Sequence, residues 1–181
     1  MKKLQAAVLL LAVILSLPAC NAKKNSSDTV SASQSAVQPQ IDPNDLTGLL
    51  TASIEPLPNW TKSEAERLTY CRQDGTDTVG GNISLYAKRV PEGTVLAEYV
   101  ELAKRDINGL YYDGIFTEIT ATTVNGIEAY EYTFTSIGRT NRFIYLYKDS
   151  WVYIIECTAP KAKFGGIISE LDTMIATYKL T

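Results

Sequence analysis

The spacing of apolar and polar residues changes several times along this chain, and each change marks an expected element. Residues 6–17 form a nearly unbroken apolar run. Ser, Lys, Asn and Gln are then frequent from 21 to about 46, where too few apolar residues occur to build a core. From 48 to 181, alternating segments typical of strands are interrupted by two segments of helical spacing. The pattern predicts one folded domain over 48–181 behind a tether over 20–47.

Two segments of the predicted domain carry apolar residues at intervals of three and four, the spacing of one helix face. The first runs from Thr94 to Asn108, with Thr94 as the expected N-cap and Gly109 just past the end. The second runs from Lys161 to Tyr178, directly after Pro160. Because an amphipathic helix must cover its apolar side, we expect both helices to lie on a sheet.

Three two-residue turns are expected between four consecutive strands, at Asn125-Gly126, Gly138-Arg139 and Asp149-Ser150. Side chains alternate between the two faces of a strand, so the turns decide which residues share a face. All three turns place the same apolar set on one side of the sheet, namely Ile119, Ala121, Tyr130, Tyr132, Phe134, Phe143, Tyr145, Tyr147, Val152 and Ile154. Their agreement predicts an antiparallel meander.

The predicted register sets Tyr132 opposite Tyr145 and Phe134 opposite Phe143, and it places Glu156 beside Phe143. Shorter strands are expected earlier in the chain, at 52–57, 68–73 and 82–89. Together the elements predict an α+β fold, in which an antiparallel meander sheet of about six or seven strands is flanked by two main helices.

The first twenty residues have the organisation of a lipoprotein signal. Lys2 and Lys3 precede the apolar run, which at 12 residues is shorter than the ~20 that a spanning helix needs. Leu17-Pro18-Ala19-Cys20 then resembles a lipobox. This predicts a signal peptide over 1–19 and acylation, including palmitate, on Cys20 as the mature N-terminus. The alternative is an ordinary secreted protein in which Cys20 has no such role.

Charge narrows the possible partners of the mature chain. Without residues 1–19, it has 15 basic and 20 acidic side chains. This balance argues against a nucleic-acid partner, whose phosphates are bound by cations. It argues equally against polybasic adhesion to anionic lipid, which leaves membrane attachment to the acyl chains. We expect a lipid-anchored domain on the extracytoplasmic side of a bacterial cell membrane.

The chain contains no histidine, which removes the usual general base and the usual metal ligand. No Ser-His or Cys-His nucleophile pair can exist, so we expect no enzyme activity, no metal site and no cofactor. An enzyme would have to use Glu156, a tyrosine or a lysine. Beyond Cys20, only Cys71 and Cys157 remain, and they form either a disulfide or two small buried side chains.

Eleven tyrosines make aromatic side chains the leading candidates for binding. Tyr130, Tyr132, Tyr145 and Tyr147 form a possible ligand face together with Glu156. The alternative is an ordinary sheet face covered by a helix. For Glu156, the functional interpretation is an acid with a raised pKa or a ligand anchor. The alternatives are a rim position past the helix, or pairing with Arg139 or Arg142.

Loops are the other place where we expect binding residues, because a rigid scaffold can position them there. The loops 74–81, 109–115 and 136–140 are the candidates, with Tyr111 and Tyr112 as the expected partner contact.

Several segments in order resemble one known family. They are Pro58-Asn59-Trp60, Gly93-Thr94-Val95-Leu96-Ala97-Glu98-Tyr99, Val124-Asn125-Gly126, Trp151-Val152-Tyr153-Ile154-Ile155, Ala159-Pro160 and Tyr178-Lys179. From about 52 to 181 the chain resembles the PsbP-like fold, named for the extrinsic photosystem subunit and shared by bacterial lipoproteins and a Ran-binding protein. The resemblance implies an α/β/α sandwich whose members mostly bind or assist rather than catalyse.

The sequence thus predicts a membrane-anchored binding or accessory domain, assisting a protein complex of the cell envelope. The alternative is a carrier that holds a small apolar ligand or lipid between helix and sheet, in a cavity lined by Tyr132, Tyr145 and Ile154.

Overall fold

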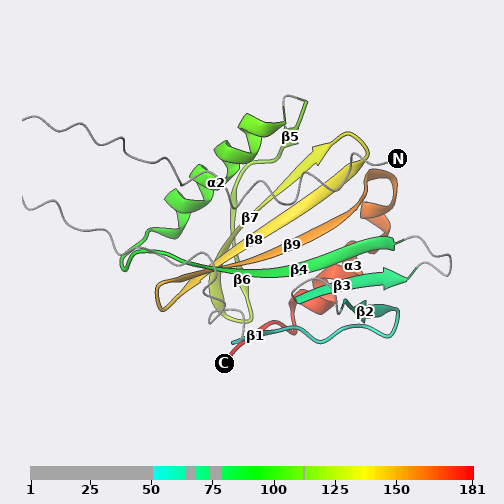
Figure 1. Ribbon diagram of the computed structural model, residues 1–181, viewed down its shortest axis with the longest axis horizontal. Helices are drawn as coiled ribbons and strands as arrows, with labels where there is room; N and C mark the ends of the chain where they lie inside the picture. Colours follow the sequence, from blue (N-terminus) through cyan, green and yellow to red (C-terminus); the bar gives the residue numbers. More distant parts are fainter. Residues whose placement is uncertain (1–50, 64–67, 74–78, 112) are drawn as a thin grey trace, which may run out of the picture. The chain divides into compact units, whose positions relative to one another are not determined.

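The computed structural model describes residues 51–63, 68–73, 79–111 and 113–181 (Figure 1). The expected signal peptide, Cys20, the tether, most of the 74–81 loop and Tyr112 lie outside the described residues. In chain order the elements are β1 (Ala52–Ser53), β2 (Trp60–Lys62), β3 (Leu68–Gln73), β4 (Val79–Arg89), α2 (Leu96–Leu110), β5 (Ile115–Phe116), β6 (Thr120–Val124), β7 (Ile127–Ser136), β8 (Arg139–Lys148), β9 (Trp151–Pro160), α3 (Lys161–Ile175) and β10 (Lys179–Leu180).

Eight of these strands form one antiparallel sheet. Its order is β2-β3-β4-β9-β8-β7-β5, and β6 also pairs with β7. The strands β1 and β10 form a second, two-stranded sheet. The expected α+β fold with an antiparallel sheet and two helices is confirmed, and the sheet is somewhat larger than the expected six or seven strands.

The two helices pack on opposite faces of the large sheet. Helix α3 packs against β4, β9 and β8, whereas α2 packs against β7 and β8 (Figure 1). Neighbouring residues of β9 show the alternation, because Ile155 belongs to the α3 side and Ile154 to the α2 side. Each helix therefore covers a different part of the sheet, on a different face.

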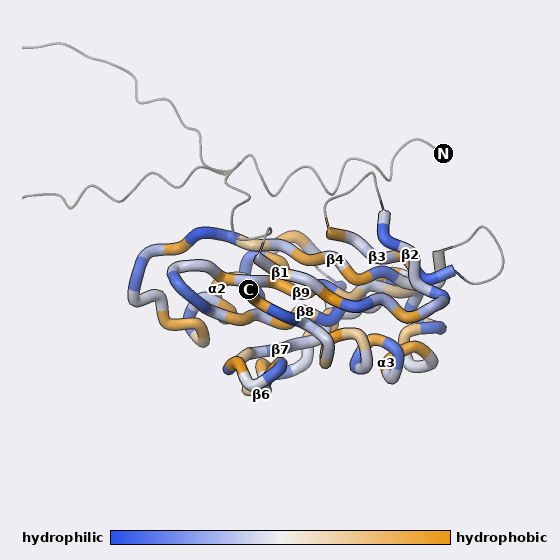
Figure 2. The backbone as a smooth tube through the Cα atoms, turned by 90° about the horizontal axis from the view of Figure 1, so that it is seen from below, coloured by the Kyte–Doolittle hydropathy of each residue, from blue (hydrophilic) through white to orange (hydrophobic). Residues whose placement is uncertain are grey.

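The α3 side holds the larger core. Its fully buried members from the sheet include Ile83, Leu85, Ile144 and Leu146. Helix α3 contributes five buried side chains, which are Phe164, Ile167, Leu171, Met174 and Ile175. Figure 2 shows hydrophilic and hydrophobic residues alternating along this helix, as its predicted one-sided burial requires.

Two of the three expected turns are confirmed, at Asn125-Gly126 and at Asp149-Ser150, where all four residues have positive φ. The middle turn is Ile137-Gly138 rather than Gly138-Arg139, since Ser136 pairs with Arg139. Gly138 then supplies the positive φ of 78° at the second turn position.

The shifted turn corrects the register between β7 and β8. Tyr132 lies opposite Phe143 and Tyr130 opposite Tyr145, while Phe134 faces Asn141. Moving the turn by one residue slides the pairing by two. Because side chains alternate with a period of two, every side chain stays on its predicted face.

Element ends differ from expectation where local chemistry decides them. Helix α2 begins at Leu96, because the Thr94 hydroxyl donates to the Pro91 carbonyl instead of capping the helix. Helix α3 ends at Ile175, although Tyr178 remains buried in the same core. Strand β1 is shorter than expected, as prolines follow it and cannot donate to a strand ladder.

Candidate functional site

The tyrosine face is covered at its centre. Tyr132 and Tyr145 are 2% and 3% exposed, and their hydroxyls are 3.2 Å apart. Their rings stack 5.9 Å apart, and Tyr99 of α2 lies with its ring centre 6.2 Å from that of Tyr145. Burial raises the pKa of Tyr132 to about 12 and also raises that of Tyr145. Both tyrosines are therefore neutral, hydrogen-bonded parts of a core.

The flanking tyrosines lie at the margin of that core. Tyr130 and Tyr147 are half-buried and pack against the buried cluster, as Phe143 and Ile154 do. The ring of Phe143 lies 5.4 Å from that of Tyr132, centre to centre. Aromatic side chains thus fill the space where a carrier would hold its ligand, which argues against the carrier hypothesis.

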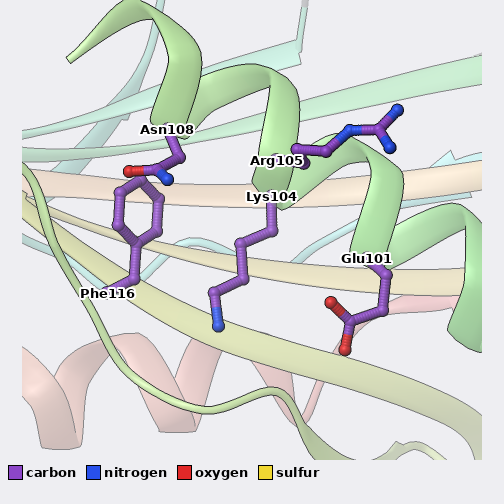
Figure 3. A pocket seen from close by; sticks show the side chains of 5 residues that line it. All are labelled: Glu101, Lys104, Arg105, Asn108 and Phe116. Carbon is purple, nitrogen blue, oxygen red and sulfur yellow. The ribbon is translucent and has the colours of Figure 1, made fainter. Parts of the chain in front are cut away.

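A shallow cleft lies between α2 and β5, with a volume of about 210 Å³. It is lined by Glu101, Lys104, Arg105, Asn108 and Phe116. Figure 3 shows Asn108 beside the Phe116 ring, with Lys104 and Glu101 extending from the following positions along the same side of the helix. The Lys104 ammonium donates to the Thr117 carbonyl at 2.8 Å, which ties α2 to the segment after β5. The cleft is smaller than typical ligand pockets of about 300–1,000 Å³, and three of its five lining residues are charged.

Glu156 lies where the sequence placed it, opposite Phe143 on β8 and opposite Ser84 on β4. Burial raises the pKa of its carboxyl, while hydrogen bonds from Tyr86 and Thr158 and the charge of Arg139 oppose the rise. The expectation that it could pair with Arg142 is wrong, because Arg142 points to the other face. Glu156 is thus a half-buried acid on the α2 face of the sheet.

Polar side chains surround Glu156 on this part of the sheet. The Thr158 hydroxyl donates to the Asn141 side chain at 2.7 Å, and the Thr69 and Ser84 hydroxyls lie 3.0 Å apart. Among the described residues, no buried side-chain polar atom lacks a hydrogen-bond partner. Since these groups satisfy one another, the polar area has the chemistry of a stable sheet face rather than of an exposed catalytic set.

Two charge networks attach α3 to the sheet, and the sequence analysis identified neither. Arg72 binds the Glu170 carboxylate with two hydrogen bonds of 2.8 and 2.9 Å, and Trp60 and Asn59 donate to the same carboxylate. These donors hold the pKa of Glu170 down, to about 2. Each network joins residues far apart in the chain, so no local pattern marks them.

The second network is centred on Arg142. Its guanidinium lies between Glu131 of β7 and Asp172 of α3, at 2.7 and 2.5 Å. Both networks are used in holding the helix, which makes them structural contacts.

The expected partner contact Tyr111 lies at one end of the sheet, with three other exposed apolar side chains. Leu110 and Ile115 are 55% and 68% exposed, Tyr111 is 38% exposed, and Ile137 in the β7–β8 turn is 87% exposed. Tyr111 lies on the α2 face, where its ring is 5.1 Å from the Phe134 ring, whereas Ile115 pairs with Thr135 just before that turn and so faces the other side of the sheet. We call these four side chains the apolar end.

Gly114 explains how the chain turns so tightly into β5 at the apolar end. A Cβ atom on this residue would lie 2.3 Å from the Phe134 ring and 3.0 Å from the Phe116 ring. Only glycine permits so close an approach. The segments 109–115 and 136–140, predicted separately as contact loops, are thereby brought to the same end of the sheet.

The domain contains two cysteines, one on each face of the sheet. Cys71 and Cys157 form no disulfide, because Cys71 lies on the α2 face of the sheet and Cys157 on the α3 face. Burial raises the pKa of the Cys157 thiol to about 12, so it is unreactive.

Within the described ranges, no group of three Cys, Asp or Glu side chains could hold a metal ion. No helix in those ranges is long and apolar enough to cross a membrane.

No protein-family model and no curated protein sequence matches this chain. Solved structures do match it. LpqN of Mycobacterium tuberculosis, described as involved in cell envelope biogenesis, is 12% identical over 72% of this chain and 83% of its own, with a TM-score of 0.56.

Two further structures match at a TM-score of 0.52. Cyanobacterial PsbP from Synechocystis is 11% identical over 78% of this chain and 92% of its own. A mutant of Mog1 is 10% identical over 72% of this chain and 90% of its own. Together with the two helices on opposite faces of an antiparallel sheet, these matches show that the chain has a PsbP-like fold.

Proposed function

We propose that this protein is a lipid-anchored accessory domain of the bacterial cell envelope, which binds a protein partner through its apolar end. The lipobox-like Leu17-Pro18-Ala19-Cys20 supports the anchor. The likeness to LpqN, which is described as involved in cell envelope biogenesis, is compatible with this location. A short tether would keep the domain at a high effective concentration, about millimolar, near a membrane partner.

The presence of four exposed apolar side chains at one end of the sheet, on both of its faces, is the observation that carries the proposal. Leu110, Tyr111, Ile115 and Ile137 come from α2, the α2–β5 connection, β5 and the β7–β8 turn. The other exposed large apolar residues of the described chain are Val95, Leu102 and Ile168, which come from different helix positions. Single exposed apolar residues are ordinary on protein surfaces, whereas a group from several elements marks an interaction site.

A binding role suits the polar groups as well. Catalysis needs several polar groups that converge on a space for substrate. Glu156, the described carboxyl with a raised pKa, is instead engaged by Tyr86 and Thr158, and its neighbours bond to one another. The proposal therefore assigns no reaction to the domain.

Site-specific photo-crosslinking in the producing cells tests this function. A photoreactive residue is placed at Leu110, and in a matched variant at Val95. Both are exposed aliphatic residues of the α2 region, 55% and 54% exposed, at opposite ends of the helix. We expect Leu110 to crosslink to one dominant envelope protein and Val95 to crosslink to none.

The Cys20→Ala variant provides the second control, because it removes the proposed lipidation site. The dominant crosslink from Leu110 should then be lost or strongly reduced. Equal crosslinking from both positions, or none from Leu110 in a membrane-bound protein, would contradict the proposed contact surface.

A further inference from the structure

The β7–β8 turn differs from the other two hairpin turns of the meander. Those turns are Asn125-Gly126 and Asp149-Ser150, polar residues of the kind that hairpin tips favour. The middle turn is Ile137-Gly138, and Ile137 is 87% exposed. Gly138 alone supplies the positive φ in this turn, so a polar residue would fit equally well at Ile137. The fold does not account for an apolar side chain at this tip.

Basic side chains flank the same tip. Arg139 follows Gly138 directly, and the Lys161 backbone N–H donates to the Gly138 carbonyl at 2.9 Å, which fixes the start of α3 beside the turn. Arg139 and Lys161 are both exposed. In the described residues of 110–116, 136–140 and 158–163, three side chains are basic, and Asp113 is the one acid. Glu156, which feels the charge of Arg139, lies further along β9.

We propose that the β7–β8 turn docks on the anionic lipid surface to which Cys20 anchors the chain, with Ile137 entering the headgroup boundary and Arg139 and Lys161 contacting lipid phosphates. An apolar side chain with basic residues nearby matches this boundary, where apolar burial and electrostatic attraction to anionic lipid both contribute to binding. The inference rests on the proposed anchor. It assigns Ile137 to the lipid surface and leaves Leu110, Tyr111 and Ile115 of the apolar end for the protein partner.

The net charge of the chain makes this orientation specific. The mature chain has five more acidic than basic residues, so most of its surface is repelled by anionic lipid. Only a locally basic tip can approach closely. A single isoleucine with two cations binds lipid weakly, but a tethered domain is held at an effective concentration of about millimolar, so weak binding is sufficient.

The length of the tether expected over 20–47 is compatible with this orientation. The described domain begins at Thr51, whose hydroxyl lies 3.3 Å from that of Tyr153, toward the opposite end of β9 from the tip. A ten-residue strand such as β8 spans about 33 Å. About 30 residues separate Cys20 from Thr51, and a flexible chain of that length has a root-mean-square span of about 30 Å.

Quenching of a tryptophan by brominated lipid tests the docking directly. The full-length lipidated protein carries Ile137→Trp or, as the matched control, Val95→Trp. It is reconstituted into vesicles of phosphatidylglycerol and phosphatidylcholine with bromines near the glycerol end of the acyl chains. The unmodified protein corrects for Trp60, which is 4% exposed, and for Trp151. Both new tryptophans replace exposed side chains, so neither substitution disturbs the core.

We expect the Trp at position 137 to lose fluorescence in brominated vesicles and the Trp at position 95 to keep it. The loss should shrink in pure phosphatidylcholine vesicles and when Arg139→Glu and Lys161→Glu are combined. No loss at position 137, although the protein co-floats with vesicles, would overturn the inference and leave the tip available for a protein partner. Equal loss at both positions would overturn it too, because the domain would then lie on the bilayer in no fixed orientation.

The lipid dependence and the anchor are separated in the same experiment. Equal quenching with and without phosphatidylglycerol would overturn the contribution of Arg139 and Lys161. Failure of the protein to float with vesicles would contradict the acyl anchor of the proposed function, and this inference would fail with it. Flotation and quenching are measured on the same samples, so the two failures are told apart.

Discussion

The two helices have similar lengths but very different relations to the sheet. Helix α3 buries five side chains and is also attached by the carboxylates of Glu170 and Asp172. Helix α2 buries only Val100 in full, and Leu102 and Leu110 on it are about half exposed. One helix therefore holds the fold together, whereas the other covers an aromatic face and carries part of the apolar end.

This difference separates stability from binding within one sheet. Side chains that pack on α3 have little freedom to change without loss of the fold. The apolar end contributes little burial, so its residues could be selected for contacts instead. The predictions below compare the two sides, beginning with the largest expected effect.

Leu171→Ala should cause the largest loss of stability, and Val100→Ala a smaller one. Leu171 is 1% exposed in the α3 core, and leucine-to-alanine changes at such sites cost about 2–5 kcal/mol. Val100→Ala removes fewer atoms, and α2 buries fewer side chains than α3, so we expect a loss of about 1–2 kcal/mol in the free energy of unfolding. Urea denaturation of both variants measures the difference. A larger loss for Val100→Ala would contradict the assignment of α3 as the main structural helix.

Glu170→Gln should destabilise the protein by about 1–3 kcal/mol at neutral pH, because Arg72 would lose its charged acceptor. The pKa of Glu170 is lowered to about 2, so its contribution is complete above its ordinary pKa of 4.5 and is lost as the pH falls toward 2. The gap between variant and parent should thus close in acid. Trp60 donates to Glu170, so its fluorescence provides a local measurement.

The effect of Glu156→Gln on the stability of the protein at neutral pH should be opposite to that of Glu170→Gln. The folded state raises the pKa of Glu156, so it binds the proton more tightly than the unfolded state does. Stability contributed by this group falls as the pH rises from 4.5 through the raised pKa. Glutamine does not ionise, so the variant should gain stability over the parent at pH 7 compared with pH 4. Denaturation of both proteins at the two pH values checks this, and a relative loss at pH 7 would contradict it.

Ile137→Ser should leave stability within about 0.5 kcal/mol of the parent, the range typical of exposed positions. Gly138 retains the positive φ, so the turn itself is unaffected. The same substitution should reduce contacts at the membrane. A loss of stability comparable with that of Leu171→Ala would show that the tip is part of the core.

Much of the sheet was predictable because its turns are local signals. Asn125-Gly126 and Asp149-Ser150 set two of the meander registers correctly. The register of β7 and β8 was not predictable, since Gly138 can occupy either position of a two-residue turn. The shift places Ile137 at the tip of the turn, within the loop 136–140 that was expected to make contacts.

The candidate contact surface was predictable in part. Tyr111 and the loops 109–115 and 136–140 were expected to make contacts, but their meeting at one end depends on β5 pairing with β7. That strand is two residues long and leaves no periodic signal. The Glu170 network could not be predicted from the sequence either, because about 100 residues separate its arginine and carboxylate.

Hydrogen–deuterium exchange of the full-length protein in membranes of the producing bacterium, compared with the Cys20→Ala form in solution, tests the central claim most directly. Amide exchange reports which segments become protected by new contacts. The account predicts added protection over 110–116 and 136–139 in the membrane-bound form, with α3 unchanged. Added protection over α3, or none over the apolar end, would contradict it.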